Sequence, residues 1–171
     1  MDTILQSIVW NQFGAAIDMF GNAVQACPED LWHENLWLES SQTSEFSEVW
    51  SVIFHTLFWL DLYLSGSKED FAPPDPFGLE ELDPSGAVSE TPYTKNELID
   101  YMTYCRSKCK NTIASMTPEL ADKPCQFSWG EISFAELLLY NMRHVQEHTA
   151  QLNLFLGNKI GWSPGWVKQA R

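Results

Sequence analysis

Four segments of this 171-residue sequence repeat apolar residues at steps of three and four, and this periodicity restricts the fold more than any other feature. The segments span residues 3–26, 45–65, 94–116 and 133–155. Residues at that spacing line one face of a helix, and an apolar face must be buried against other helices. Because no strand–helix–strand alternation and no internal repeat are present, the sequence predicts an all-α protein with a four-helix bundle.

Local signals place the ends of these helices. Ser44 is expected to cap the second helix, and Gly66 to end it. Capping boxes, in which Ser or Thr precedes Glu by three positions, begin at Thr94 and Ser133, ahead of the third and fourth helices. The fourth helix is expected to stop near residues 157–158, where Gly is followed by Asn.

The connection between the second and third helices is long and irregular. Residues 67–93 contain five of the nine prolines and show little periodicity. A connection of this length indicates a crossing between distant ends of the bundle or a cover over a functional site. Neither half of the chain would make a good core alone, so residues 1–171 are predicted to form a single domain. Residues 119–130 are expected to form a loop or a short extended piece.

Charge and composition exclude several classes of protein. The net charge is −13, and residues 1–67 contain nine acidic side chains and no Lys or Arg. This balance argues against binding to nucleic acid, which needs clustered basic residues. No apolar run is long enough to cross a membrane, and the N-terminus lacks the positive region of a secretory signal. We therefore expect a cytoplasmic protein whose four cysteines are reduced thiols.

Cys105 and Cys109 lie four positions apart on the third helix. Such a pair could be half of a site for a soft metal, but no neighbouring Cys-x-x-Cys or His supports one. Small residues on a partly buried helix face are the favoured interpretation. No phosphate-binding loop, nucleophile elbow or dinucleotide fingerprint is present either.

Three histidines share a different pattern. His144 and His148 lie on one face of the fourth helix, and two imidazoles at that spacing can reach one ion at the Zn–N distance of ~2.0–2.1 Å. His55 borders an apolar stripe on the second helix. We predict that these three are neutral nitrogen ligands of one divalent metal with an open fourth position; the alternative is three hydrogen-bonded core residues. His33, in the first connection, is expected to be an ordinary surface or capping histidine.

Polar residues near the ligands could orient them, since metal-bound imidazoles usually donate their free N–H to a neighbouring group. The candidates are Asn141, Gln151, Tyr140 and Glu48; solvent-exposed or interhelical roles are the alternative for each. Glu147 adjoins His148 and so points about 100° away around the helix, off the metal face.

A histidine on the second helix followed by His-x-x-x-His on the fourth resembles the DinB/YfiT-like superfamily in order, helix placement and spacing. The resemblance implies a four-helix fold and a metal site at His55, His144 and His148. Some members of that superfamily transfer groups to bacillithiol, mycothiol or glutathione, one group isomerises maleylpyruvate, and many are described as metal-dependent hydrolases. Members often pair, so a homodimer is expected, with apolar surface from Trp32, Trp37 and the tail residues Trp162 and Trp166.

These patterns predict a metal-dependent enzyme that acts on a small molecule. Zinc is the first choice of metal and nickel the second, because imidazole suits both. Water or a low-molecular-weight thiol at the open position would become the nucleophile, which gives hydrolysis or thiol-dependent S-transfer, with transfer slightly favoured. A non-enzymatic metal- or ligand-binding bundle is the alternative.

Overall fold

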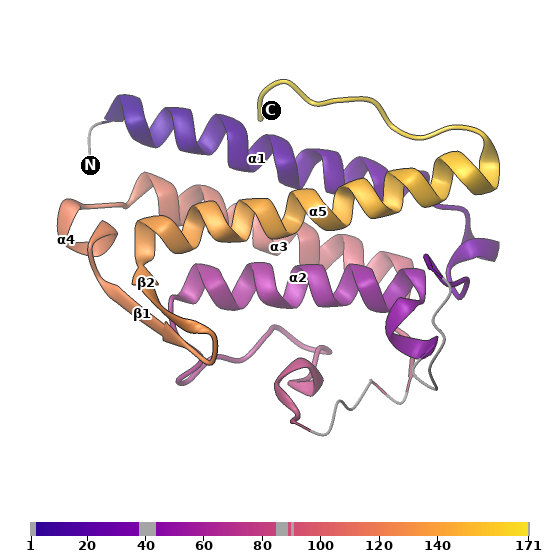
Figure 1. The fold of residues 1–171 in the computed structure, drawn as a ribbon, viewed down its shortest axis with the longest axis horizontal. Helices are drawn as coiled ribbons and strands as arrows, with labels where there is room; N and C mark the ends of the chain where they lie inside the picture. The colour runs from indigo at the N-terminus through magenta and orange to yellow at the C-terminus, as the bar shows by residue number, and fades with distance from the viewer. Residues whose placement is uncertain (1–2, 38–43, 85–88, 90, 171) are drawn as a thin grey trace.

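The structure, a computed structural model, describes residues 3–37, 44–84, 89 and 91–170. Four long helices pack side by side: α1 (Thr3–Ala26), α2 (Val49–Ser65), α3 (Lys95–Ala114) and α5 (Phe134–Ile160) (Figure 1). Helices α1 and α2 each lie against both α3 and α5. The predicted all-α four-helix bundle is therefore confirmed.

The core of the bundle is apolar and continuous. Its largest fully buried side chains include Phe13, Phe20, Phe58, Tyr101 and Leu137, which come from all four long helices. Burying a side chain of this size stabilises a fold by about 1.5–3 kcal/mol. The burial of these side chains is therefore expected to keep the bundle folded without any bound ion.

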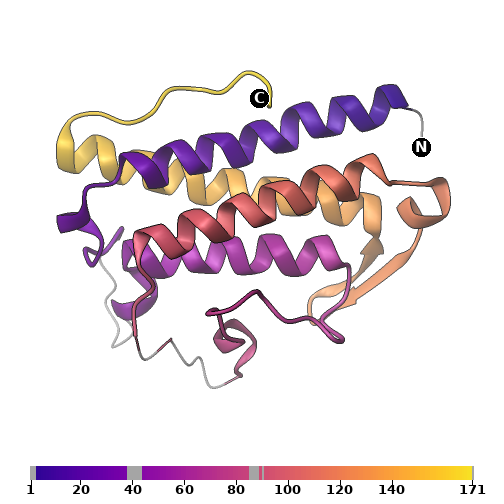
Figure 2. The same cartoon turned by 180° about the vertical axis from the view of Figure 1, so that it is seen from behind.

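Helices α2 and α3 run in the same direction, so the chain must travel the length of the bundle between them (Figures 1 and 2). The predicted crossing connection is confirmed, and it includes a short 3₁₀ helix, η3 (Glu80–Leu82). Aromatic side chains anchor it: Phe71 packs edge-on to Phe58 of α2, and Phe77 stacks on Tyr101 of α3 with ring centroids 4.4 Å apart.

The second helix begins later than the sequence predicts. Ser44–Ser47 form a 3₁₀ helix, η2, and α2 starts at Val49 after an extended Glu48. The backbone at this point pairs with the first connection, which contains the 3₁₀ helix η1 (Glu29–Leu31), instead of continuing as a helix. Leu36 N–H donates to the Ser47 carbonyl, and Val49 N–H donates to the Glu34 carbonyl. The prediction that Ser44 caps α2 was wrong for this reason.

The other helix ends agree more closely with the sequence. Gly66 ends α2 in the left-handed conformation with φ 72°, and both capping boxes form, at Thr94 and Ser133. Helix α3 stops at Ala114, two residues early. Helix α5 passes through Gly157 and ends only at Ile160, followed by Gly161 in the left-handed conformation with φ 73°.

Residues 118–133 hold more structure than the sequence predicts. A single helical turn, α4 (Pro118–Ala121), leads into an antiparallel hairpin of β1 (Pro124–Phe127) and β2 (Gly130–Ser133). The predicted short extended piece is thus half of a hairpin. Four-residue strands offer too few residues for an alternation to stand out in the sequence.

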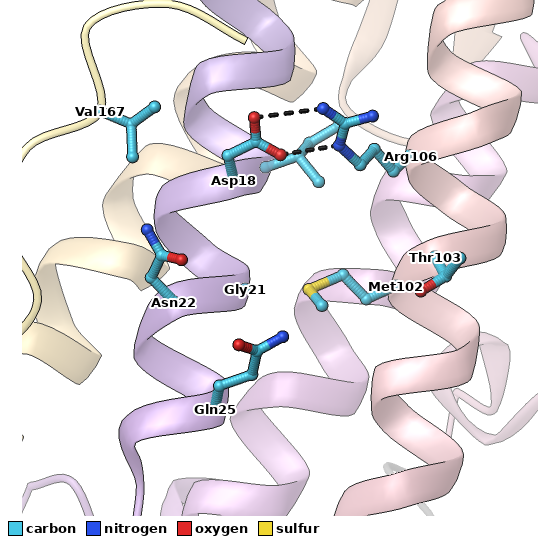
Figure 3. A pocket seen from close by; sticks show the side chains of 9 residues that line it. Asp18, Gly21, Asn22, Gln25, Met102, Thr103, Arg106 and Val167 are labelled. Atoms are coloured by element: carbon cyan, nitrogen blue, oxygen red, sulfur yellow. Dashed lines mark hydrogen bonds and ion pairs between the residues drawn. The ribbon is translucent and has the colours of Figure 1, made fainter. Parts of the chain in front are cut away.

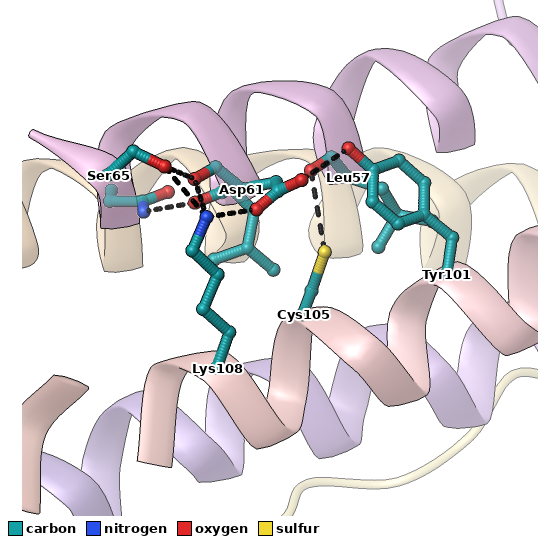
Figure 4. A network of polar contacts seen from close by, with 8 residues as sticks. Leu57, Asp61, Ser65, Tyr101, Cys105 and Lys108 are labelled. Atoms are coloured by element: carbon teal, nitrogen blue, oxygen red, sulfur yellow. Dashed lines mark hydrogen bonds and ion pairs between the residues drawn. The ribbon is translucent and has the colours of Figure 1, made fainter. Parts of the chain in front are cut away.

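A charge pair between a buried Asp61 and a partly exposed Lys108 joins α2 to α3 (Figure 4). The Asp61 carboxylate is fully buried and accepts hydrogen bonds from Lys108 Nζ at 2.5 Å and from the Tyr101 hydroxyl at 3.0 Å. Burial beside Cys105 and Asp61 raises the pKa of Tyr101 far above its ordinary value, so the phenol stays a donor. Lys108 also donates to Ser65 at 2.7 Å, which completes the network.

The C-terminal tail lies across α1 (Figure 1). Val167 packs on Ala15 and Met19, and Ala170 N–H donates to the Asn11 carbonyl at 3.0 Å. Trp162 and Trp166 remain exposed, but Trp32 is buried and cannot contribute to an exposed apolar surface as predicted. No helix in the described residues is long and apolar enough to cross a membrane.

Candidate metal centre

The three predicted ligands come together between α2 and α5. His144 Nε2 lies 3.3 Å from His55 Nε2 and 3.1 Å from His148 Nε2. Three nitrogens bound tetrahedrally at ~2.0–2.1 Å from one ion would be about 3.3–3.4 Å apart. The cluster therefore has the spacing of three nitrogen ligands, and it could hold a metal ion.

Helix packing sets this geometry. Between Val49 and Leu64 every residue of α2 is buried except His55 and Trp59, which lie one turn apart on the same face. On α5, His144 and His148 flank the buried Val145 at the edge of the face that packs on α2. All three imidazoles are half-buried, which suits a site that is open on one side.

Two of the three imidazoles make a hydrogen bond through Nδ1, the ring nitrogen that points away from the cluster. His55 Nδ1 donates to Glu81 Oε2 at 2.7 Å, and the indole N–H of Trp59 donates to the same oxygen at 2.8 Å. His148 Nδ1 donates to Gln151 Oε1 at 2.8 Å. The buried His144 Nδ1 has no hydrogen-bond partner among the described residues. Carboxylate and amide partners of this kind orient metal-bound histidines in proteins.

These partners decide where the protons lie. A carboxylate only accepts, so the neutral His55 carries its proton on Nδ1 and presents a lone pair at Nε2; His148 does the same opposite Gln151 Oε1. His144 Nε2 faces both lone pairs and can donate to only one of them. At least one Nε2 lone pair then faces the nitrogen of another imidazole with no proton between them. A divalent cation would accept all three, so the donor set fits a metal.

The electrostatics favour neutral imidazoles at His144 and His148. Burial, with smaller contributions from His148 and His55, lowers the pKa of His144 to about 3. Burial and the neighbouring His55 also lower the pKa of His148. Neutral nitrogen is the form that binds a metal, so no proton has to be displaced from these two ligands near neutral pH.

The cluster opens on a cavity of about 210 Å³. Its lining consists of Trp37, Phe46, Ser51, Val52, His55, Glu81 and His148. A larger groove of about 630 Å³ follows the last turns of α5 from Gln151 to Lys159, and Trp37 lines both spaces. Two of the three candidate ligands therefore face a space that a small molecule can enter.

The expected supporting residues are mostly elsewhere. Gln151 contacts His148 as predicted, but Glu48 accepts hydrogen bonds from His33 and Trp50 instead. Asn141 is buried and donates to the Leu60 carbonyl, which ties α5 to α2. Tyr140 stacks on Trp129 of the hairpin, with ring centroids 4.8 Å apart. His33 and Glu147 are exposed, as expected.

Glu81 is the residue that sequence reasoning missed. It belongs to η3, in the middle of the connection between α2 and α3. The length of that connection predicted either a crossing between bundle ends or a cover over a functional site, but no periodicity showed which carboxylate would reach His55.

No other group of three His, Cys, Asp or Glu side chains in the described residues could hold an ion. Cys105 and Cys109 are buried in the core, where burial raises both thiol pKa values, so the non-metal interpretation of this pair is favoured. A separate cavity of about 230 Å³ lies between α1 and α3 (Figure 3). An ion pair between Asp18 and Arg106 borders it. It contains no histidine.

The fold and the cluster together define a class: helical bundles in which histidines from facing helices form a site that could hold a metal. The family model described as the DinB superfamily matches residues 12–152, and the chain belongs to that superfamily. A comparison with curated proteins found no match.

A solved structure supports the same fold. The DinB-like protein YjoA of Bacillus subtilis superimposes with a TM-score of 0.60 over 96% of this chain and 99% of that chain. Its sequence identity is 14%, so this likeness shows the fold alone.

Proposed function

We propose that this protein is a metal-dependent enzyme in which His55, His144 and His148 hold one divalent ion beside an open cavity. The observation that supports this most strongly is that His144 Nε2 lies within hydrogen-bonding distance of the Nε2 atoms of both His55 and His148. Zinc remains the first choice and nickel the second, because three imidazoles suit either metal.

When bound, such an ion would polarise a substrate carbonyl and lower the pKa of a bound water or thiol. The chain supplies the remaining requirements. Glu81 and Gln151 hold the imidazoles of His55 and His148 in orientation through their Nδ1 atoms. Trp37 and Val52 line the cavity with apolar surface that a substrate can contact.

Two nucleophiles suit this site, and each gives a different reaction class. A low-molecular-weight thiol would give S-transfer, which thiol-dependent members of the superfamily make the first candidate. Water would give hydrolysis and needs no second substrate. In both cases the substrate is a small molecule, since the cavity measures about 210 Å³.

The alternative is a non-enzymatic metal- or ligand-binding bundle. The cavity beside His55 and His148 argues for an enzyme, because an ion with a purely structural role needs no access for a second molecule.

The test begins with metal content. The purified protein should contain close to one divalent ion per chain, and His55→Ala, His144→Ala and His148→Ala should each bind it much more weakly. His33→Ala is the matched control, because His33 is exposed and contacts Glu48. Full occupancy in the double variant His144→Ala/His148→Ala would overturn the proposal.

The second step measures turnover. The metal-loaded protein is incubated with a panel of electrophilic substrates, in the presence of each of several thiols or in water alone. Turnover that requires both the metal and one thiol supports S-transfer, and turnover in water alone supports hydrolysis. Metal binding without turnover across a broad panel would favour the binding bundle.

A further inference from the structure

We infer that the cavity at the histidines and the groove along α5 form one substrate site, built for a molecule with a metal-binding head and an uncharged, apolar body. This inference rests on the proposed function and names the substrate class of the same site.

The two spaces are neighbours that have one lining residue in common. Trp37 lines both the cavity of about 210 Å³ and the groove of about 630 Å³. Gln151 lines the groove while its side chain holds His148, which lines the cavity. A ligand bound at the histidines would therefore extend along α5 toward Asn158. The groove alone has the size of small-molecule sites, which measure about 300–1,000 Å³.

Apolar side chains stand at this site although they are open to water. Leu154 is 68% exposed on α5, and Trp37 and Phe46 are each 37% exposed. Phe155 and Leu36 complete the apolar lining of the groove. Contiguous exposed apolar surface next to a polar centre is typical of ligand-binding grooves. Leu154 and Trp37 would gain most from contact with an apolar body.

The charges around the site disfavour an anionic body. Lys159 is the one Lys or Arg among the described lining residues, and its ammonium is already paired with Glu34 at 2.9 Å and lies over the Phe155 ring. The carboxylate of Glu81 lines the cavity itself. A carboxylate on the ligand body would lose its water and meet no unpaired cation there.

Other basic residues that could have served an anionic substrate lie elsewhere. Lys108 is bound to Asp61, and Lys110 lies over the ring of Trp10. Arg143 lines a different cavity, between α1, α5 and the C-terminal tail. The lining of the two spaces therefore suits a neutral partner, and a thiol that serves S-transfer at this site would be one without multiple negative charges.

Hydroxamic acids test this, because their head group binds divalent metals and their body can be varied. The zinc-loaded full-length protein is titrated calorimetrically with acetohydroxamic acid, benzohydroxamic acid and 4-carboxybenzohydroxamic acid. We expect the phenyl group to improve the dissociation constant at least tenfold over the methyl group. We expect the added carboxylate to remove most of that gain.

Variants of Leu154 test whether the phenyl group binds in the groove. Because Leu154 is exposed, these substitutions should not disturb folding. Leu154→Ser should reduce the phenyl preference severalfold, and Leu154→Lys should improve binding of the carboxylated compound relative to benzohydroxamic acid. Leu139→Ser is the matched control, since Leu139 is 50% exposed on the same helix and lines neither space. It should leave all three affinities unchanged.

A zinc-loaded protein that binds the three compounds equally, or binds the carboxylated one most tightly, would overturn this inference alone. A protein that holds no metal would overturn the proposed function and the inference with it. If the phenyl preference is absent and Leu154→Ser instead dissociates a dimer, a second copy of the chain occupies the groove, and the inference is wrong.

Discussion

Glu81 Oε2 lies 2.7 Å from His55 Nδ1, although the two residues are 26 positions apart and belong to a 3₁₀ turn and a long helix. This contact fixes the His55 proton on Nδ1 and leaves Nε2 free to bind an ion.

Replacing Glu81 by Gln should therefore weaken metal binding without unfolding the bundle. Loss of an orienting partner of a metal-bound histidine typically lowers affinity about 10–100-fold. The affinity is measured by competition with a chromophoric chelator. Glu80→Gln is the matched control, because Glu80 belongs to the same turn but contacts Tyr93. Equal affinities for Glu81→Gln and the unmodified protein would show that the contact does not support the metal.

Removing the metal should leave the fold intact. The buried apolar faces of four helices provide most of the stability, so the far-ultraviolet circular dichroism should keep nearly all of its helical signal after chelation. Metal in ~100-fold excess over its dissociation constant should raise the free energy of unfolding by about 2.7 kcal/mol. Loss of most of the helical signal would instead indicate a structural metal.

The buried pair of Asp61 and Lys108 yields a prediction that is independent of the metal. Lys108→Met should lower the free energy of unfolding by about 3 kcal/mol, because it leaves a fully buried carboxylate without its cation. The double variant Asp61→Asn/Lys108→Met should recover much of this loss. Urea denaturation provides the values. Lys68→Met, at an exposed position in the connection, should change stability by less than ~0.5 kcal/mol.

The protein should form a homodimer that uses its exposed aromatic surface. Trp162 and Trp166 are 59% and 75% exposed, whereas the tail that contains them is held to α1 through Val167 and Ala170. Sedimentation velocity at tens of micromolar should show the dimer, and Trp162→Ala/Trp166→Ala should shift it toward monomer. A monomeric unmodified protein would contradict this prediction and leave the metal site unaffected.

The parts of the site that lie on helices could be predicted, and the part on the connection could not. Helical spacing alone brings His144 and His148 to one face and places Gln151 within reach of His148. Glu81 follows no such period, because its position depends on how Phe71 and Phe77 anchor the connection to α2 and α3. Contacts between residues so far apart in the chain produce no pattern in the local sequence.

The same difference between local and distant contacts explains which helix ends could be predicted. Capping boxes at Thr94 and Ser133 place two helix starts correctly, since every group in a capping box is within four residues. The start of α2 was misplaced, because the backbone near Glu48 pairs with Glu34 and Leu36. Tyr140 was misassigned for a similar reason, as the hairpin brings Trp129 against it.

The crossing between the parallel helices α2 and α3 divides the metal centre into two parts that can change separately. The bundle fixes three nitrogen atoms through a core that tolerates little alteration. The carboxylate that adjusts the basicity of one of them comes from a surface segment, where a doubling of length costs only about 0.6 kcal/mol of closure entropy. Substitutions at and around Glu81 would therefore retune the metal through His55 while the core stays unchanged, as long as Phe71 and Phe77 keep the segment anchored to α2 and α3.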